Sequence, residues 1–162
     1  MDFFDLAKNM EKESRKMYED FSAAAPLKEL KSVFSFLAME EQRHWELFTD
    51  MQKKAAVAVP VDENILHRAK QVLSGWKAGF SAPSTISDFE AMYRKAQKTE
   101  SDAVAFYSKE KENLKTFEHK RVLDQIIEQE KRHEKLMDEL SKFVRRPKEW
   151  VENAEFYHLD EY

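Results

Sequence analysis

The chain has 162 residues, of which 36% are charged, only 2 are glycine and 4 are proline, and its formal net charge is −4. This length is enough for one domain with a substantial core, and the shortage of turn-forming residues favours long helices. Because the chain has no cysteine, disulfides, thiolate nucleophiles, iron–sulfur clusters and cysteine-ligated zinc are excluded.

The sequence has none of the features that indicate binding to nucleic acid, insertion into a membrane, or secretion. No basic stripe suggests a nucleic acid, and no apolar run approaches the ~20 residues of a membrane span. The first ten residues, MDFFDLAKNM, lack the basic segment and apolar run of a secretory signal. We therefore expect a cytoplasmic protein that binds neither nucleic acid nor membrane.

Apolar residues recur at helical spacing in four long segments. Pro26 separates the first two segments, and Pro147 follows the fourth, as expected for residues that end a helix. Ser87 or Asp88 is the expected N-cap of the third. The predicted helices run approximately over residues 2–24, 27–56, 88–114 and 117–144.

A long connection, residues 57–87, separates the second and third helices and contains prolines and glycines. We expect a short helix near residues 63–73 within it. Short turns on either side of one long connection are typical of a four-helix bundle built from two helical hairpins and a crossover. The sequence therefore predicts an all-α four-helix bundle over residues 1–146, followed by a C-terminal extension, 147–162, with one short helix.

Each predicted helix carries ionisable residues on its apolar stripe, near its middle. The order is E, then E-x-x-H, then E, then E-x-x-H, with one element per helix. The two halves also share short sequence matches, KES with TES and EQRH with EKRH, which indicate an internal repeat of one hairpin. The residues concerned are Glu13, Glu41, His44, Glu100, Glu130 and His133.

Four carboxylates and two imidazoles in a dry core need compensation, because one unpaired buried carboxylate costs on the order of several kcal/mol. Two divalent cations would supply four positive charges. Glu13 and Glu100 would each bind one ion terminally, and Glu41 and Glu130 would bridge. Oxygen and nitrogen ligands without sulfur suit Fe(II) or Mn(II), and zinc could bind as an inert substitute. The alternative is a metal-free helical interaction module whose core Glu and His residues pair among themselves.

The segments EKES, AMEEQRH, TESDAVAFY and IIEQEKRH resemble the rubrerythrin family of the ferritin-like superfamily. The resemblance implies a non-haem di-iron centre, reduction of hydrogen peroxide or dioxygen in oxidative-stress defence, and a homodimer whose helices can be exchanged. Family members usually carry a rubredoxin-like domain with two C-x-x-C motifs, so a separate electron donor such as a rubredoxin is expected here. The implied iron ligands are Glu13, Glu41, His44, Glu100, Glu130 and His133.

One position departs from the family pattern. The family has a further Glu three residues after the ligand of the third helix, and here that position is Ala103. The remaining six-ligand set is symmetric and closer to ferroxidase-type centres, so iron oxidation and handling is the alternative function. Tyr107, two turns from Glu100 on the same face, is the candidate catalytic residue; it either hydrogen-bonds to a ligand or bound oxygen or is an ordinary packed tyrosine.

Overall fold

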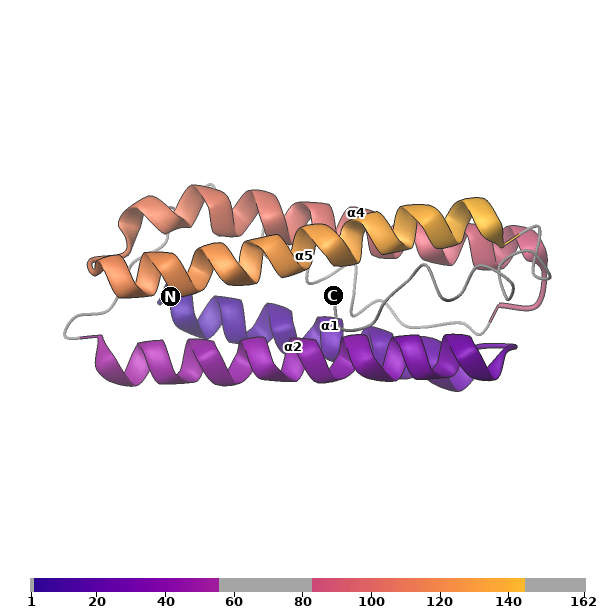
Figure 1. Ribbon diagram of the computed structural model, residues 1–162, viewed down its shortest axis with the longest axis horizontal. Coiled ribbons are helices and arrows are strands. Elements are labelled where there is room, and N and C mark those ends of the chain that lie inside the picture. Colours follow the sequence, from indigo (N-terminus) through magenta and orange to yellow (C-terminus); the bar gives the residue numbers. More distant parts are fainter. Residues whose placement is uncertain (1, 56–82, 145–162) are drawn as a thin grey trace.

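The computed structural model describes residues 2–55 and 83–144, and these form a bundle of long helices (Figure 1). Its elements agree with the sequence prediction to within a few residues, and the all-α four-helix bundle is confirmed. The third predicted helix ends early because its last turn is a short 3-10 helix, η1. The elements are α1 (Phe3–Ala24), α2 (Lys28–Lys54), α4 (Ile86–Glu110), η1 (Lys111–Asn113) and α5 (Phe117–Phe143).

Threonine side chains begin both helices of the second hairpin. The Thr116 hydroxyl accepts a hydrogen bond from the backbone N–H of His119 at 3.1 Å and caps α5. The N-cap of α4 is Thr85, whose hydroxyl accepts from the N–H of Asp88 at 3.1 Å. The prediction of Ser87 or Asp88 as this cap is therefore wrong. Thr85 has extended backbone angles, whereas Ser87 and Asp88 already lie in the helix, so only Thr85 has the geometry of a capping residue.

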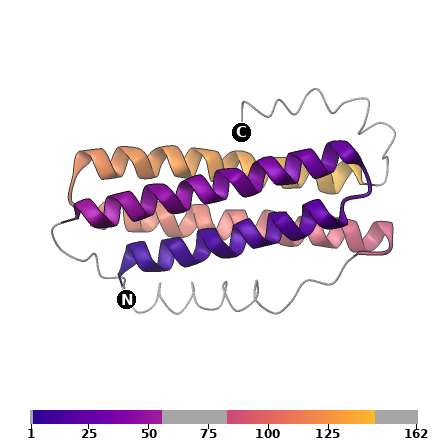
Figure 2. The same ribbon diagram turned by 90° about the horizontal axis from the view of Figure 1, so that it is seen from below.

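The helices pair in the expected way, α1 along α2 and α4 along α5, with α2 also contacting α5 between the hairpins. Figures 1 and 2 show all four running nearly along the long axis of the molecule. Because the hairpins lie face to face, each helix turns one stripe of side chains toward a common interior.

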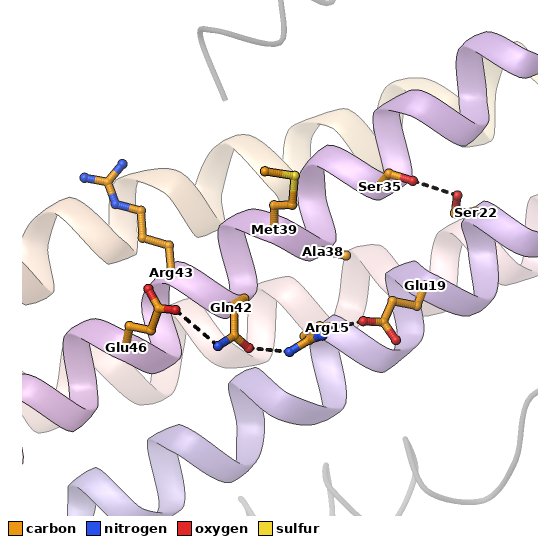
Figure 3. A pocket seen from close by; sticks show the side chains of 9 residues that line it. All are labelled: Arg15, Glu19, Ser22, Ser35, Ala38, Met39, Gln42, Arg43 and Glu46. Carbon is orange, nitrogen blue, oxygen red and sulfur yellow. Dashed lines mark hydrogen bonds and ion pairs between the residues drawn. The ribbon is translucent and has the colours of Figure 1, made fainter.

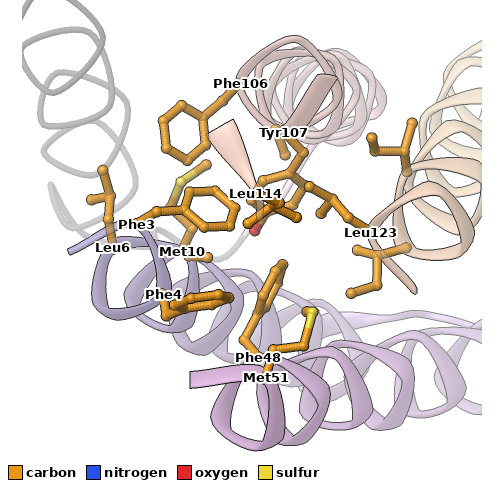
Figure 4. Close-up of a cluster of buried hydrophobic side chains, with 14 residues drawn as sticks. Phe3, Phe4, Leu6, Met10, Phe48, Met51, Phe106, Tyr107, Leu114 and Leu123 are labelled. Atoms are coloured by element: carbon orange, nitrogen blue, oxygen red, sulfur yellow. The ribbon is translucent and has the colours of Figure 1, made fainter. Parts of the chain in front are cut away.

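The interior has two apolar clusters, one toward each end of the bundle. The first contains the start of α1 and the end of α2, where the rings of Phe3 and Phe48 meet edge-on at 5.9 Å (Figure 4). The second contains the end of α1 and the start of α2, around Tyr18, Phe34 and Leu37. Between the two clusters every helix contributes buried polar residues. This middle layer is closed from both ends by side chains that exclude water.

Some predictions fall on residues outside the described ranges. These are the short helix near 63–73, the crossover up to residue 82, and the helix in the extension 147–162. The division into a domain of residues 1–146 and an extension stays a prediction. Within the described residues, no helix is both long and apolar enough to cross a membrane.

Candidate metal centre

Six side chains from all four helices meet in the polar middle layer. They form two overlapping groups, Glu11, Glu41, His44 and Glu130 in the first and Glu41, Glu100, Glu130 and His133 in the second. Each group offers one ligand atom per residue, with all of these atoms within 4.8 Å of one another. None of the six is more than 2% exposed. Two carboxylates are thus shared, and each group adds one carboxylate and one imidazole of its own.

The histidines turn their Nδ1 atoms toward the carboxylates. His44 Nδ1 lies 2.8 Å from Glu130 Oε1 and 3.4 Å from Glu11 Oε2. His133 Nδ1 lies 2.8 Å from Glu41 Oε1 and 3.3 Å from a Glu130 oxygen. The imidazole rings stack with their centroids 6.2 Å apart. Each Nδ1 is therefore available as a ligand atom, and the two halves have nearly the same geometry.

The structure corrects the sequence prediction on α1. Glu13 is half-buried and belongs to neither group. Glu11 takes the place in the cluster that was predicted for Glu13. Two residues correspond to about 200° around a helix, so Glu11 and Glu13 face nearly opposite directions. The other five predicted residues come together, although their role as metal ligands remains a proposal at this stage.

A regular spacing in the sequence identifies Glu11. Glu11 and Glu41 are 30 residues apart, and so are Glu100 and Glu130, whereas Glu13 breaks the equality. One offset of 89 residues relates every site residue of the first hairpin to its counterpart in the second, as for His44 and His133. The matching segments KES and TES lie at a different offset and align Glu13, rather than Glu11, with Glu100.

Two tyrosines form hydrogen bonds between the two hairpins at the centre. Tyr107 Oη donates to Glu11 Oε1 at 2.7 Å, and Tyr18 Oη donates to Glu100 Oε1 at 2.6 Å. Burial raises the pKa of both phenols, and the nearby carboxylates raise it further, so both remain protonated donors. The sequence analysis named Tyr107 as the candidate, and Tyr18 is its counterpart at the same 89-residue offset.

Each histidine also has a partner on its outer side. His133 Nε2 lies 2.5 Å from Glu40 Oε2, and His44 Nε2 lies 2.5 Å from Gln129 Oε1. With a cation bound at Nδ1, the neutral imidazole would carry its single N–H at Nε2, where the oxygen acceptor lies, and would turn its Nδ1 lone pair toward the centre. Outer partners of this kind fix the orientation of a ligating imidazole and raise its basicity. Sequence analysis missed both residues, each of which comes directly before a central glutamate.

The centre has more hydrogen-bonding capacity than its own residues can satisfy. In the described part of the chain, seven buried side-chain oxygen or nitrogen atoms have no hydrogen-bond partner, and six of them belong to this centre. Both carboxylate oxygens of Glu41 and Nδ1 of His133 are among the six, although Nδ1 of His133 lies at ion-pair distance, 2.8 Å, from Glu41 Oε1. Buried polar atoms without a partner are rare in proteins and require an explanation. Atoms of this kind converging from four helices fit ligands of cations.

Electrostatics leads to the same conclusion. Burial raises the pKa of Glu41 and of Glu100, and the charge of Glu130 raises both further. Burial by itself lowers the pKa of His44 and His133, but the surrounding carboxylates outweigh it and raise the pKa well above the usual 6.5. Without cations the centre therefore takes up protons to balance its negative charge. Two divalent cations can replace those protons, and mixed oxygen and nitrogen ligands suit Fe(II) or Mn(II).

The hollows on the outer surface are separate from this centre. One of about 490 Å³ lies between α1 and α2 (Figure 3). Polar side chains cross it, with Arg15 donating to Gln42 at 2.5 Å and to Glu19 at 2.7 Å. None of the six central residues lines this hollow or its neighbour beside Trp45. These two hollows are therefore not lined by the residues of the centre.

Comparisons with known proteins yield one match. A family model described as Rubrerythrin matches residues 2–141. Searches of curated proteins and of solved structures give no match. The matched range contains α1, α2, α4, all of α5 except its last two residues, and every residue of the centre.

Proposed function

Because the chain belongs to the rubrerythrin family of ferritin-like di-iron carboxylate proteins, we propose that it is a di-iron oxidoreductase that reduces hydrogen peroxide or dioxygen. One observation supports this most strongly: the buried Glu and His cluster whose unpartnered atoms converge from all four helices. When bound, a pair of ferrous ions supplies the two electrons that convert one hydrogen peroxide and two protons into two waters. A separate donor, such as a rubredoxin, returns the electrons.

The two groups of residues would hold the two ions in a symmetric arrangement. Glu11 and His44 would hold one ion and Glu100 and His133 the other, with Glu41 and Glu130 between them. Each ion would then receive one imidazole and three carboxylate groups, two of them shared. The four carboxylates balance the four positive charges, so that the buried centre is close to neutral.

The surrounding residues keep this arrangement in place. The phenols of Tyr18 and Tyr107 each hold the terminal carboxylate of the opposite hairpin, so the two halves of the centre are fixed relative to one another. We propose that Tyr107 acts in this way, as a positioning residue. The apolar clusters on both sides exclude bulk water, which strengthens every charge interaction inside.

The test uses the full chain loaded anaerobically with two equivalents of Fe(II). We expect it to consume hydrogen peroxide or dioxygen faster than the same concentration of free Fe(II). Glu130→Gln should abolish the acceleration, because Glu130 serves both ions, and Glu13→Gln should leave it unchanged. A loaded protein that consumes neither oxidant faster than free Fe(II) would rule the proposal out.

Position 103 supports an alternative function, oxidation and handling of iron. Ala103 is buried in the first apolar cluster, so the centre lacks the further carboxylate that the family has at this position. A symmetric six-residue centre is closer to a ferroxidase. Size-exclusion chromatography separates the two proposals: a large hollow assembly supports iron storage, and a homodimer supports the oxidoreductase. Exchange of helices between two copies stays a proposal alongside the dimer.

A further inference from the structure

The two halves of the centre differ at one charged position. Under the 89-residue offset the central glutamates, histidines and tyrosines of one hairpin correspond to identical residue types in the other. The outer partners of the histidines break this symmetry. Glu40 bonds to His133, whereas its counterpart Gln129 bonds to His44. One imidazole therefore donates to a carboxyl group and the other to an amide.

The geometry of these two contacts is the same, so the difference is chemical. Both Nε2-to-oxygen distances are 2.5 Å, and both acceptors come directly before a central glutamate, Glu41 or Glu130. The Glu40 side chain is 14% exposed, so its charge is only partly screened by water. Matched positions and matched distances leave the negative charge of Glu40 as the distinguishing feature of this pair.

A carboxylate behind an imidazole strengthens a metal site in two ways. It polarises the N–H, which makes the opposite nitrogen a better electron donor, and it adds a negative charge near the cation. An amide oxygen orients the ring but adds no charge. Loss of an outer partner typically lowers metal affinity by about 10- to 100-fold, and partial exposure places Glu40 near the lower end, about 10-fold.

We propose that Glu40 makes the two cation positions unequal, so that the position at His133 fills first and holds its ion more tightly than the position at His44. The inference rests on the proposed metal centre, but it concerns the order of filling and is independent of the oxidant. At limiting metal the protein then holds one ion at His133. The ion at His44 is the one that dissociates and exchanges.

One other difference lies close to the centre. Ser14, which is buried on α1 three residues after Glu11, corresponds to Ala103 on α4. A neutral hydroxyl on the His44 side cannot supply the charge that Glu40 supplies on the His133 side. Exchanging only residues 40 and 129 leaves this difference unchanged, so the variants below isolate the outer partners.

The test follows the order of filling with Zn²⁺, which is diamagnetic and has no redox chemistry. Protein labelled with ¹⁵N at histidine is titrated with Zn²⁺, and the Nδ1 resonances of His44 and His133 report which position is filled. Well below one equivalent of Zn²⁺, we expect about 10-fold more Zn²⁺ at His133 than at His44. Glu40→Gln and Gln129→Glu should each bring the ratio close to 1, and the exchange E40Q/Q129E should invert it.

The outcomes separate this inference from the proposed function. If the exchanged variant binds two ions and still fills His133 first, Glu40 does not set the order, and the inference is wrong while the centre stands. If even the unaltered protein binds no Zn²⁺ at either histidine, the metal centre itself is wrong. Should the double variant fail to fold, Gln129→Glu alone decides: an unchanged 10-fold preference contradicts the inference, and an equalised ratio supports it.

Discussion

Replacing Glu11 tests the most specific difference between sequence and structure. Glu11 is 2% exposed, lies 3.4 Å from His44 Nδ1, and is the one carboxylate that belongs to the His44 group alone. Glu13, two residues along the same helix, belongs to neither group. Glu11→Gln should therefore weaken the cation position at His44, and Glu13→Gln, a matched change of charge on the same helix, should not.

The size of the effect follows from mass action. Loss of a direct carboxylate ligand should weaken the His44 position by at least ~100-fold, the upper end for loss of an outer partner. A metal concentration of 100 Kd stabilises the folded protein by about 2.7 kcal/mol per position, and the same concentration at the weakened position gives only about 0.4 kcal/mol. The difference of ~2.3 kcal/mol corresponds to a Tm about 5–9 °C lower for a chain of this size.

Thermal unfolding with and without Mn²⁺ measures this difference, since Mn²⁺ suits the ligand set and avoids redox chemistry during the scan. We expect the metal-dependent rise in Tm to shrink by ~5–9 °C in Glu11→Gln and to be retained in Glu13→Gln. Subtracting the metal-free Tm of each variant removes any effect on the fold itself. A result in which Glu13→Gln loses the rise and Glu11→Gln keeps it would refute the assignment on α1.

Three further predictions concern the surroundings of the centre and the helix ends. Tyr107→Phe removes the phenol that holds a terminal carboxylate, and the free energy of unfolding of the Mn²⁺-loaded protein should fall by about 1.5–3 kcal/mol in urea titrations; no change would mean that the hydrogen bond is not formed. The raised pKa values of His44 and His133 mean that the metal-free fold binds more protons than the unfolded chain, so its Tm should fall as the pH rises above about 6.5 and should rise again on metal addition. The pKa of Glu130 is lowered, so this group changes stability only below about pH 4.5, outside this window. A metal-free Tm that stays constant or rises from pH 6.5 to 8.5 would contradict the charge balance. Thr116→Ala should destabilise the protein by about 1 kcal/mol through loss of the α5 cap, and Lys115→Ala, at an exposed neighbouring position, should change stability by less than ~0.5 kcal/mol.

The sequence predicted the fold and most of the centre because both depend on helical periodicity. Four apolar stripes required four helices, and the ionisable residues at their middles had to meet wherever the stripes met. Glu100 and the two E-x-x-H pairs lie on their stripes without ambiguity, and the structure brings all five of these residues together. The pairing of helices followed from the short turns and the long connection.

What the sequence did not predict depends on a choice between neighbouring candidates or on side-chain reach. Glu11 and Glu13 both lie near an apolar residue of α1. The match between KES and TES favoured Glu13, while the equal 30-residue spacings favour Glu11, which the structure places in the cluster. Four residues of types that cap helices occur between positions 84 and 88, and only the backbone geometry selects Thr85. The outer contacts of Glu40 and Gln129 cross between hairpins, so no pattern within one helix reveals them.

Anomalous X-ray diffraction from crystals of the iron-loaded protein tests the central claim most directly. We expect two iron peaks in the middle layer, one beside Glu11 and Nδ1 of His44 and the other beside Glu100 and Nδ1 of His133. A crystal grown in excess iron that shows no peak in this layer, with the six side chains paired only among themselves, would contradict the account.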